Sequence, residues 1–306
     1  MHLKLIVMLT ALAPLAFAAP PRDRQNFATP DAAVQALVKA TQAKDGKALS
    51  KLLGPQGQEL IDSGDPVADQ NARGRFAANY KAAHSLDKSK AGSITLEVGE
   101  DKWPFPIPLV ASDGRWYWDS AAGTEELINR RVGENELSTI QSCLAFVDAQ
   151  QEYYQRNVQK DSLQHYAKRL ISTDGKRDGL YWPTTGNDAP SPMGEEFAAA
   201  RAEGYLQADS PQGAPYHGYI YRTLVRQGPA ATGGAYEYLV NGELLGGFAL
   251  VAFPADYGNS GVMTFIVNHD GVVYSKDLGP FTREVAMGMA EFNPDSLWKR
   301  EASANN

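Results

Sequence analysis

One amphipathic stretch near the middle of the chain, residues 135–158, limits the possible folds more than any other feature. Its apolar side chains recur every three or four positions, as on one face of a helix. They are Leu137, Ile140, Leu144, Val147, Tyr154 and Val158. Such a helix extends over roughly 30 Å, at about 1.5 Å per residue, and its stripe needs a covering partner. We therefore expect this helix to be the spine of the second half of the chain.

The sequence offers two starting points for this helix, about one turn apart. Asn135 fits an N-cap, and Ser138 with Gln141 has the spacing of a capping box. Gly133 precedes both positions and is predicted to separate the central helix from a short helix at residues 124–132. We place a domain boundary at this glycine.

Residues 1–18 have the composition of a secretory signal peptide. Lys4 supplies the positive start, residues 5–15 form an apolar run, and Ala16 and Ala18 fit a cleavage site. The run is too short to span a bilayer comfortably, and no cysteine follows the cleavage site to carry a lipid. We expect a periplasmic or secreted protein with no transmembrane segment in the mature chain.

About 290 residues remain after the signal, a length typical of two domains. Because Lys4 is the only charged residue of the signal, its removal changes the formal net charge from −7 to −8. An acidic chain without a cluster of Lys and Arg argues against nucleic acid as a partner. The single cysteine, Cys143, cannot form an internal disulfide bond. It is either a redox thiol or, as is common for free cysteines, a buried packing residue.

The predicted fold class is α+β. Residues 19–28 are expected to be a tether, residues 29–132 a first domain, residues 133–298 a second domain and residues 299–306 a flexible tail. In the first domain we expect helices at residues 30–43, 47–53 and 66–80, and strands at 93–98, 105–111 and 115–119. A turn at Asp113-Gly114 joins the last two strands.

Helices followed by a curved antiparallel sheet resemble the cone-shaped nuclear-transport-factor-two-like (cystatin-like) fold. That resemblance implies an apolar cavity between helices and sheet. Trp103, Trp116 and Trp118 either line the cavity as ligand-binding residues or pack the core, since both uses require the same side chains.

In the second domain, an irregular segment with helices near residues 162–171 and 195–203 precedes a series of strands. The strands are expected at 216–225, 235–240, 247–253, 262–267 and 272–275, with turns at Asn241-Gly242 and Asp270-Gly271. Their spacing predicts an antiparallel meander. Its apolar face, from Phe248, Leu250, Met263 and Phe265 or their alternates, would be covered by the central helix.

Several stretches closely resemble a bacterial exported family known as domain of unknown function 2950. They include GDPVADQNARGRF (64–76), AAGTEELINRRVGENEL (121–137), RDGLYWP (177–183) and GGFALVAFPADYGNSGVMTFIVNHDGVVYSKDLGP (246–280). The second half is also similar to the head domains of type IV pilins, through AQQEYY at the helix end and the TFIVNHDGVVY strand pair. It lacks the prepilin peptidase site and the long apolar helix of pilins, so the likeness implies a pilin-head-like fold and not filament assembly.

Linear catalytic motifs are missing from the sequence. Gly258-Asn259-Ser260-Gly261 is one residue away from a nucleophile elbow and lies between strands. No phosphate-binding loop, dinucleotide fingerprint or zinc motif occurs, and the histidines lack ligand spacing. We predict no catalytic residue, no metal site and no cofactor. Tyr219 and Tyr221 share one face of a predicted strand, and either line a ligand groove or serve as strand packing, while Arg222 takes the other face.

Two functional hypotheses remain. The first is an exported envelope protein that acts by non-enzymatic binding or assembly, with an envelope protein or a small molecule as partner. The alternative is a small-molecule enzyme with a general acid or base in the cavity of the N-terminal cone, a site that needs no linear motif.

Overall fold

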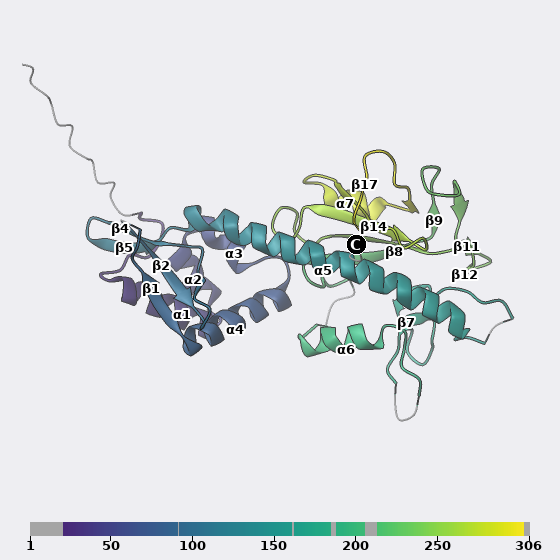
Figure 1. Ribbon diagram of the computed structural model, residues 1–306, viewed down its shortest axis with the longest axis horizontal. Coiled ribbons are helices and arrows are strands. Elements are labelled where there is room, and N and C mark those ends of the chain that lie inside the picture. The colour runs from purple at the N-terminus through teal and green to yellow at the C-terminus, as the bar shows by residue number, and fades with distance from the viewer. Residues whose placement is uncertain (1–20, 91, 161, 185–187, 206–212, 303–306) are drawn as a thin grey trace, which may run out of the picture.

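The computed structural model describes residues 21–302 except 91, 161, 185–187 and 206–212. The predicted signal, residues 1–18, lies outside the described residues. Two groups of elements lie along one long helix, and Figure 1 shows one group at each end. We call them the N-terminal and C-terminal modules. Each contains helices and antiparallel strands, so the α+β class is confirmed.

The N-terminal module begins with four α-helices, three of which have a side-chain N-cap. They are α1 (Pro30–Gln42), α2 (Gly46–Leu53), α3 (Gln58–Ile61) and α4 (Pro66–Ala82), with the 3-10 turn η1 (Pro55–Gly57) before α3. Thr29 accepts a hydrogen bond from the Ala32 amide, and Asp65 accepts bonds from two amides of α4. Proline follows each of these two caps, at the first position of the helix.

An antiparallel sheet completes this module, in the order β1-β2-β4-β5, with β3 beside β2. Its strands are β1 (His84–Asp87), β2 (Ser93–Val98), β3 (Trp103–Pro104), β4 (Leu109–Ser112) and β5 (Arg115–Trp118). The predicted hairpin at Asp113-Gly114 joins β4 to β5. Phe27 exchanges main-chain hydrogen bonds with Trp116 and is buried, so this part of the predicted tether is incorrect.

A single helix, α5 (Ser120–Arg156), spans 37 residues and joins the modules. The predicted break at Gly133 is therefore wrong, and so is a helix start at Asn135 or Ser138. A glycine inside a helix costs only about 1 kcal/mol. Packing on both sides outweighs that cost, because Leu127 contacts the N-terminal core and Ile140 the C-terminal core. The division into domains at this point stays a prediction.

The C-terminal module is organised around a five-stranded antiparallel sheet in the order β17-β15-β14-β13-β8. The strands are β8 (Tyr219–Leu224), β13 (Ala249–Pro254), β14 (Met263–Asn268), β15 (Tyr274–Asp277) and β17 (Lys299–Arg300). Successive strands of this sheet are neighbours, which is a meander. The predicted strand at 235–240 is wrong as a member of it, because these residues form two short strands that pair outside this sheet. Because β17 pairs with β15, the start of the predicted flexible tail is ordered.

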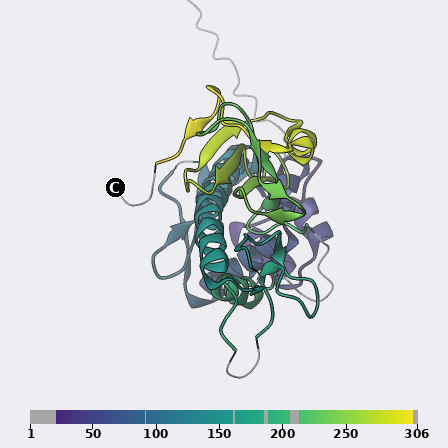
Figure 2. The same cartoon turned by 90° about the vertical axis from the view of Figure 1, so that its right-hand side faces the viewer.

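Both faces of this sheet are buried. On one face, Phe248, Leu250 and Phe265 pack against α5, as the sequence predicts; Figure 2 shows the sheet above the helix. On the other face, Val251, Phe253 and the rest of a second cluster pack beneath α7 (Thr282–Gly288) and β16 (Glu291–Phe292). Leu137 is 67% exposed, so the apolar stripe that α5 packs against the C-terminal core begins at Ile140.

Smaller elements surround the far end of α5. They are β6 (Arg169–Ile171), β7 (Gly179–Tyr181), α6 (Gly194–Ala202), β9 (Arg226–Gln227), β10 (Tyr236–Glu237), β11 (Leu239–Val240) and β12 (Glu243–Leu244). The predicted helix at 162–171 is wrong, because this segment is extended. The buried amide of Gln150 holds it, bonding both the N–H and the C=O of Ala167. The predicted helix at 195–203 is confirmed as α6.

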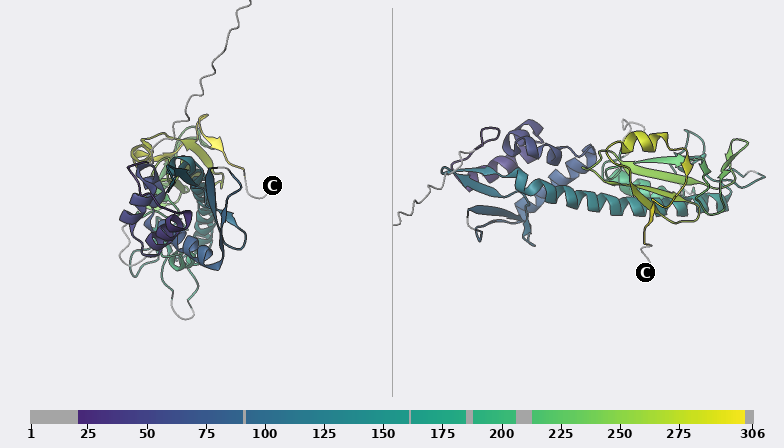
Figure 3. Two further views of the ribbon diagram at one scale, coloured as in Figure 1. Left: turned by 90° about the vertical axis from the view of Figure 1, so that its left-hand side faces the viewer. Right: turned by 90° about the horizontal axis from the view of Figure 1, so that it is seen from above.

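Seen from above, α5 extends from the N-terminal module to the C-terminal module (Figure 3). Within the part of the chain that the structure describes, no helix has the length and apolar character needed to cross a membrane.

The continuity of α5 predicts opposite effects at two glycines. Gly133 is exposed, with open space where a Cβ would lie, so Gly133→Ala should raise the free energy of unfolding by about 1 kcal/mol. At Gly123 a Cβ would lie 2.5 Å from the Pro106 carbonyl oxygen, so Gly123→Ala should destabilise the protein. Urea denaturation followed by circular dichroism measures both. A destabilising Gly133→Ala would argue against an uninterrupted helix.

Candidate functional site

Where the two modules meet, polar side chains of α5 and α4 bind loops from both. We call this region the polar junction, made of Asp65, Asp69, Arg131, Asn135, Glu136, Tyr205 and Asn259. Its loops are residues 62–65, before α4, and 255–262, between β13 and β14, together with the chain entering β8. Residues almost 200 positions apart are joined directly here, since Asn259 donates to the Asp62 carbonyl at 2.9 Å.

Asp65 lies at the centre of the junction and is 1% exposed. One carboxylate oxygen accepts from the Val67 and Ala68 amides and so caps α4. The other accepts from the Tyr205 hydroxyl at 2.9 Å and from the Gly218 amide at 2.8 Å. A buried charge is tolerated when it is fully hydrogen-bonded. This carboxylate therefore fastens the start of β8 to the N-terminal module.

Arg131 provides the second connection, from the middle of α5. Its guanidinium donates to the Glu59 carbonyl at 2.9 Å and to the Asn259 side chain, so it contacts both modules. Burial lowers the pKa of Arg131, while the carboxylates of Asp69 and Asp256 oppose that shift. The planar guanidinium suits such a divergent set of acceptors better than an ammonium group does.

One turn further along, Asn135 and Glu136 bind the loop between β13 and β14. Asn135 donates to the Ser260 carbonyl at 2.8 Å, and a Glu136 oxygen accepts from the Val262 and Met263 amides at 3.0 Å each. Asn135, which the sequence predicts to be an N-cap, thus lies inside α5 and binds a loop with its side chain. Ser260 is buried and its hydroxyl bonds to Asp256, so it lies in a structural turn and not in a nucleophile elbow.

Asp69 is a partly buried carboxyl of the junction, in the first turn of α4. One of its oxygens accepts from the Ser63 amide at 3.0 Å. Burial raises the pKa of Asp69 above its usual value, although the bonds from Ser63 and the charges of Arg131 and Arg73 act in the opposite direction. The ionised form of this group is therefore disfavoured in the folded protein.

A histidine pair lies at the outer side of the junction. His217 Nε2 is 2.6 Å from a Glu203 carboxylate oxygen, and its ring stacks on Tyr216 with centroids 4.2 Å apart. His217 has a φ of 48°, in the left-handed region that disfavours most side chains, and is followed by Gly218 with a φ of 74°. This strained bend directs the Gly218 amide to Asp65.

The three tryptophans of the predicted cavity have separate positions. Trp118 is 0% exposed and contacts Phe105 edge-on within the N-terminal core. Trp103 is half-buried, and the Arg130 guanidinium lies 5.6 Å from its ring centroid. Trp116 is half-buried and pairs with Phe27. Trp118 thus packs in the core, and a ligand-binding role for the three tryptophans stays a prediction.

Tyr219 and Tyr221 point to the same side of the sheet, toward α5. Tyr219 is fully buried and its hydroxyl donates to the Met263 carbonyl at 2.8 Å. Tyr221 is half-buried and lies 3.4 Å from the Thr139 hydroxyl. Arg222 points to the opposite face and donates to carbonyls at the end of α7. Packing accounts for both tyrosines, and their ligand-binding role stays untested.

Cys143 is a packing residue of the C-terminal core. It is fully buried, and burial raises the pKa of its thiol to about 12. The reactive thiolate is therefore scarce at neutral pH.

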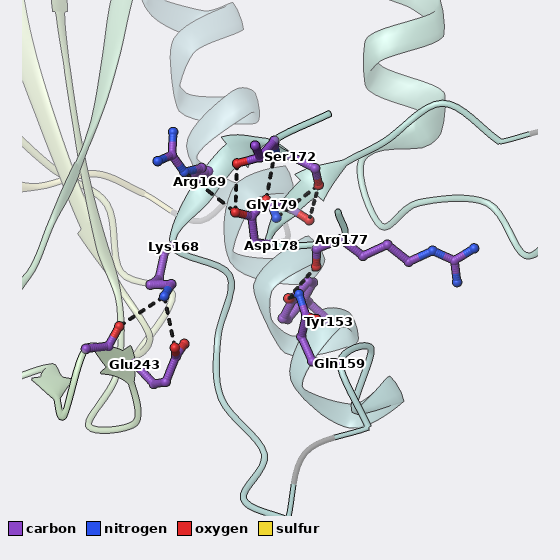
Figure 4. Close-up of polar contacts among 11 residues, drawn as sticks. Tyr153, Gln159, Lys168, Arg169, Ser172, Arg177, Asp178, Gly179 and Glu243 are labelled. Carbon is purple, nitrogen blue, oxygen red and sulfur yellow. Dashed lines mark hydrogen bonds and ion pairs between the residues drawn. The ribbon is translucent and has the colours of Figure 1, made fainter. Parts of the chain in front are cut away.

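A second polar cluster lies at the far end of α5, where β6 and β7 pair (Figure 4). Asp178 accepts from the amide and the hydroxyl of Thr173, at 2.8 Å each. The Tyr153 hydroxyl donates to the Arg177 carbonyl at 2.6 Å. These contacts close a loop on α5 and bind main-chain groups. Among the residues that the structure describes, no group of three or more His, Cys, Asp or Glu side chains is placed to hold a metal ion.

Two surface hollows lie in the N-terminal module, away from the predicted tryptophans. One, of about 300 Å³, is bounded by α1, the end of α4 and β1. The other, of about 520 Å³, is a wide groove between η1, α3 and the first turns of α5.

Removing the Asp65 carboxylate should cost more stability than the loss of a helix cap alone. Asp65→Ala loses the cap and leaves the Tyr205 hydroxyl and the Gly218 amide without acceptors, so about 3 kcal/mol of stability should be lost. Thr29→Ala is the matched control, since it loses only the cap of α1, worth about 1 kcal/mol. Equal losses in urea denaturation would contradict a fastening role for Asp65.

The raised pKa of Asp69 predicts a pH-dependent stability difference. The favourable contribution of the protonated carboxyl is complete below its unfolded pKa and is lost as the pH rises through the higher folded pKa. Asp69→Asn, which keeps an acceptor for the Ser63 amide, should therefore gain stability relative to the natural chain between about pH 4 and pH 7. Chemical denaturation across this range measures the difference. A difference that does not change with pH would refute the assignment.

Comparison with known proteins gives a family for the chain and no further relatives. Searches of curated proteins and of solved structures each found no significant match. Residues 24–301 match the family described as "Protein of unknown function (DUF2950)". That region begins in the segment before α1 and ends after β17, and so includes both modules and the whole polar junction. The chain therefore belongs to the DUF2950 family of proteins of unknown function.

Proposed function

We propose that the chain is an exported bacterial envelope protein, periplasmic or secreted, that acts by binding or assembly and not by catalysis. Export is supported by the composition of residues 1–18, with Lys4, an apolar run and a cleavage site at Ala18. The family resemblance supports a bacterial source.

The observation that carries the proposal is how the polar junction uses its side chains. Asp65 and Glu136 bind main-chain groups of loops, and Arg131 binds a main-chain carbonyl of α3. Groups engaged in this way hold two modules in a fixed arrangement. A rigid body with two modules at the ends of one helix presents surfaces at constant separation, which favours recognition of a large partner.

The proposal includes a finer description of each module. Four helices beside a curled sheet support a cone-shaped, nuclear-transport-factor-two-like domain at the N-terminal end. A long helix packed on a meander supports a pilin-head-like domain at the other end. A fold by itself does not determine a reaction, so these two fold assignments favour no particular chemistry.

One observation favours the alternative, an enzyme. His217 and Glu203 form a close pair beside Tyr216 at the outer side of the junction, an arrangement that can transfer protons. This pair differs from the site in the N-terminal cone that the sequence predicts. A turnover that is lost in His217→Gln without loss of stability would support the enzyme.

The experiment uses the full mature chain as bait in cross-linked envelope extracts. We expect N-terminal sequencing to begin at Ala19 and the bait to capture one partner, in fixed proportion, that excess untagged chain displaces. Asp65→Ala bait, with a loosened junction, should capture less partner than Thr29→Ala bait, which loses a cap only. Retention of residues 1–18, or capture that untagged chain does not displace, would contradict the proposal.

A further inference from the structure

We propose that the outer edge of β1 binds an extended peptide segment of a partner protein, which adds a strand to the N-terminal sheet. This inference rests on the proposed binding function and names the partner class for one surface.

The main-chain groups of β1 alternate between the side facing β2 and the outer side. The Ala83 carbonyl accepts from the Gly99 amide at 2.9 Å, which fixes which residues of β1 bond to β2. Main-chain groups of successive residues point to opposite sides of a strand. Ser85 and Asp87 therefore bond across to β2, whereas Leu86 directs its N–H and C=O to the outer side.

The outer side of β1 is an open edge. The strand order is β1-β2-β4-β5, and within the described part of the chain β1 pairs with β2 alone. Figure 1 shows β1 as an outer strand of the N-terminal sheet. An edge strand with unpaired donors and acceptors is a template for another strand. Its alternating N–H and C=O groups match a polypeptide main chain and not a sugar, a nucleotide or a lipid.

Beside this edge lies the hollow of about 300 Å³, at the small end of the range for ligand sites. Its apolar floor comes from Val34 on α1, Leu86 on β1 and Leu96 on β2. Leu96 is fully buried and Val34 nearly so. A strand paired with β1 would direct alternate side chains toward α1. The hollow then accommodates one aliphatic or aromatic side chain.

The rim of the hollow is polar and carries both signs of charge. Asp31 lies at the start of α1 and Lys88 follows β1, and both are exposed. Between them, the Gln35 amide donates to the Tyr80 hydroxyl at 3.1 Å, and the Tyr80 and His84 rings stack at 3.9 Å. We therefore expect an extended segment with a central apolar residue flanked by charged residues of opposite sign.

The probe is a library of random nonapeptides displayed on phage, selected on the full mature chain. A synthetic copy of the strongest binder should shift the amide resonances of Leu86 and Val34 and slow hydrogen exchange at Leu86. Leu86→Pro removes the outward N–H and leaves the ladder to β2, so it should weaken binding about tenfold or more, the effect of one lost hydrogen bond.

Two variants keep the test independent of folding. Leu86→Val retains the N–H and should retain binding. Gln35→Trp leaves the backbone of β1 unchanged and fills the hollow, so it should also block the peptide.

Selected peptides that leave the β1 resonances unmoved, or that bind equally well to Leu86→Pro and Gln35→Trp, would overturn the inference. Self-association that Leu86→Pro abolishes, without peptide binding, would overturn it in favour of a second copy of the chain. A Leu86→Pro bait that still captures its envelope partner would remove this site and leave the proposed function standing.

Discussion

The packing of α5 against two separate cores is the constraint on which the rest of the structure depends. Its first turns approach the N-terminal module so closely that Gly123 leaves no room for a side chain beside Ile107. Its later turns bury Phe146 and Val147 under the C-terminal sheet. Because the helix is continuous, the two cores cannot rotate independently about a flexible linker. Each module therefore limits the position of the other.

The polar junction fixes the orientation of the two modules about the axis of α5. Helix packing alone allows some rotation about the helix axis, since apolar contacts are not directional. One orientation is selected by hydrogen bonds with particular main-chain groups, which Asp65 accepts and Arg131 and Asn259 donate. The strained His217 persists because the surrounding contacts, above all the bond from Gly218 to Asp65, outweigh a local penalty of about 1–3 kcal/mol. Groups used in this way hold surfaces in register, which is why we favour binding over catalysis.

Sequence reasoning identified most elements but missed the junction. The sequence predicts a helix from residue 66, and Asp65 caps that helix, α4. Nothing in the local pattern shows that its second oxygen accepts bonds from residues 140 and 153 positions away. The only available signal was the position of the junction within family-like stretches, at residues 64–76, 121–137 and 246–280. The roles of the tryptophans and tyrosines could not be predicted from the sequence either, because the same side chains pack a core and line a cavity.

Periodicity, capping residues and turn residues, all local properties, determined the α+β class, the meander, the starts of α1 and α4 and the apolar face that α5 covers. The tertiary structure decided what depends on distant partners. A glycine at position 133 opposes a helix by only about 1 kcal/mol, and packing at both ends of α5 exceeds this preference. Likewise, residues 162–171 follow an extended path because distant residues bond their main chain: Gln150 bonds Ala167, the Leu244 carbonyl accepts from the Tyr166 amide, and β6 pairs with β7. Local preferences are small, so contacts between distant residues settle the outcome wherever the two disagree.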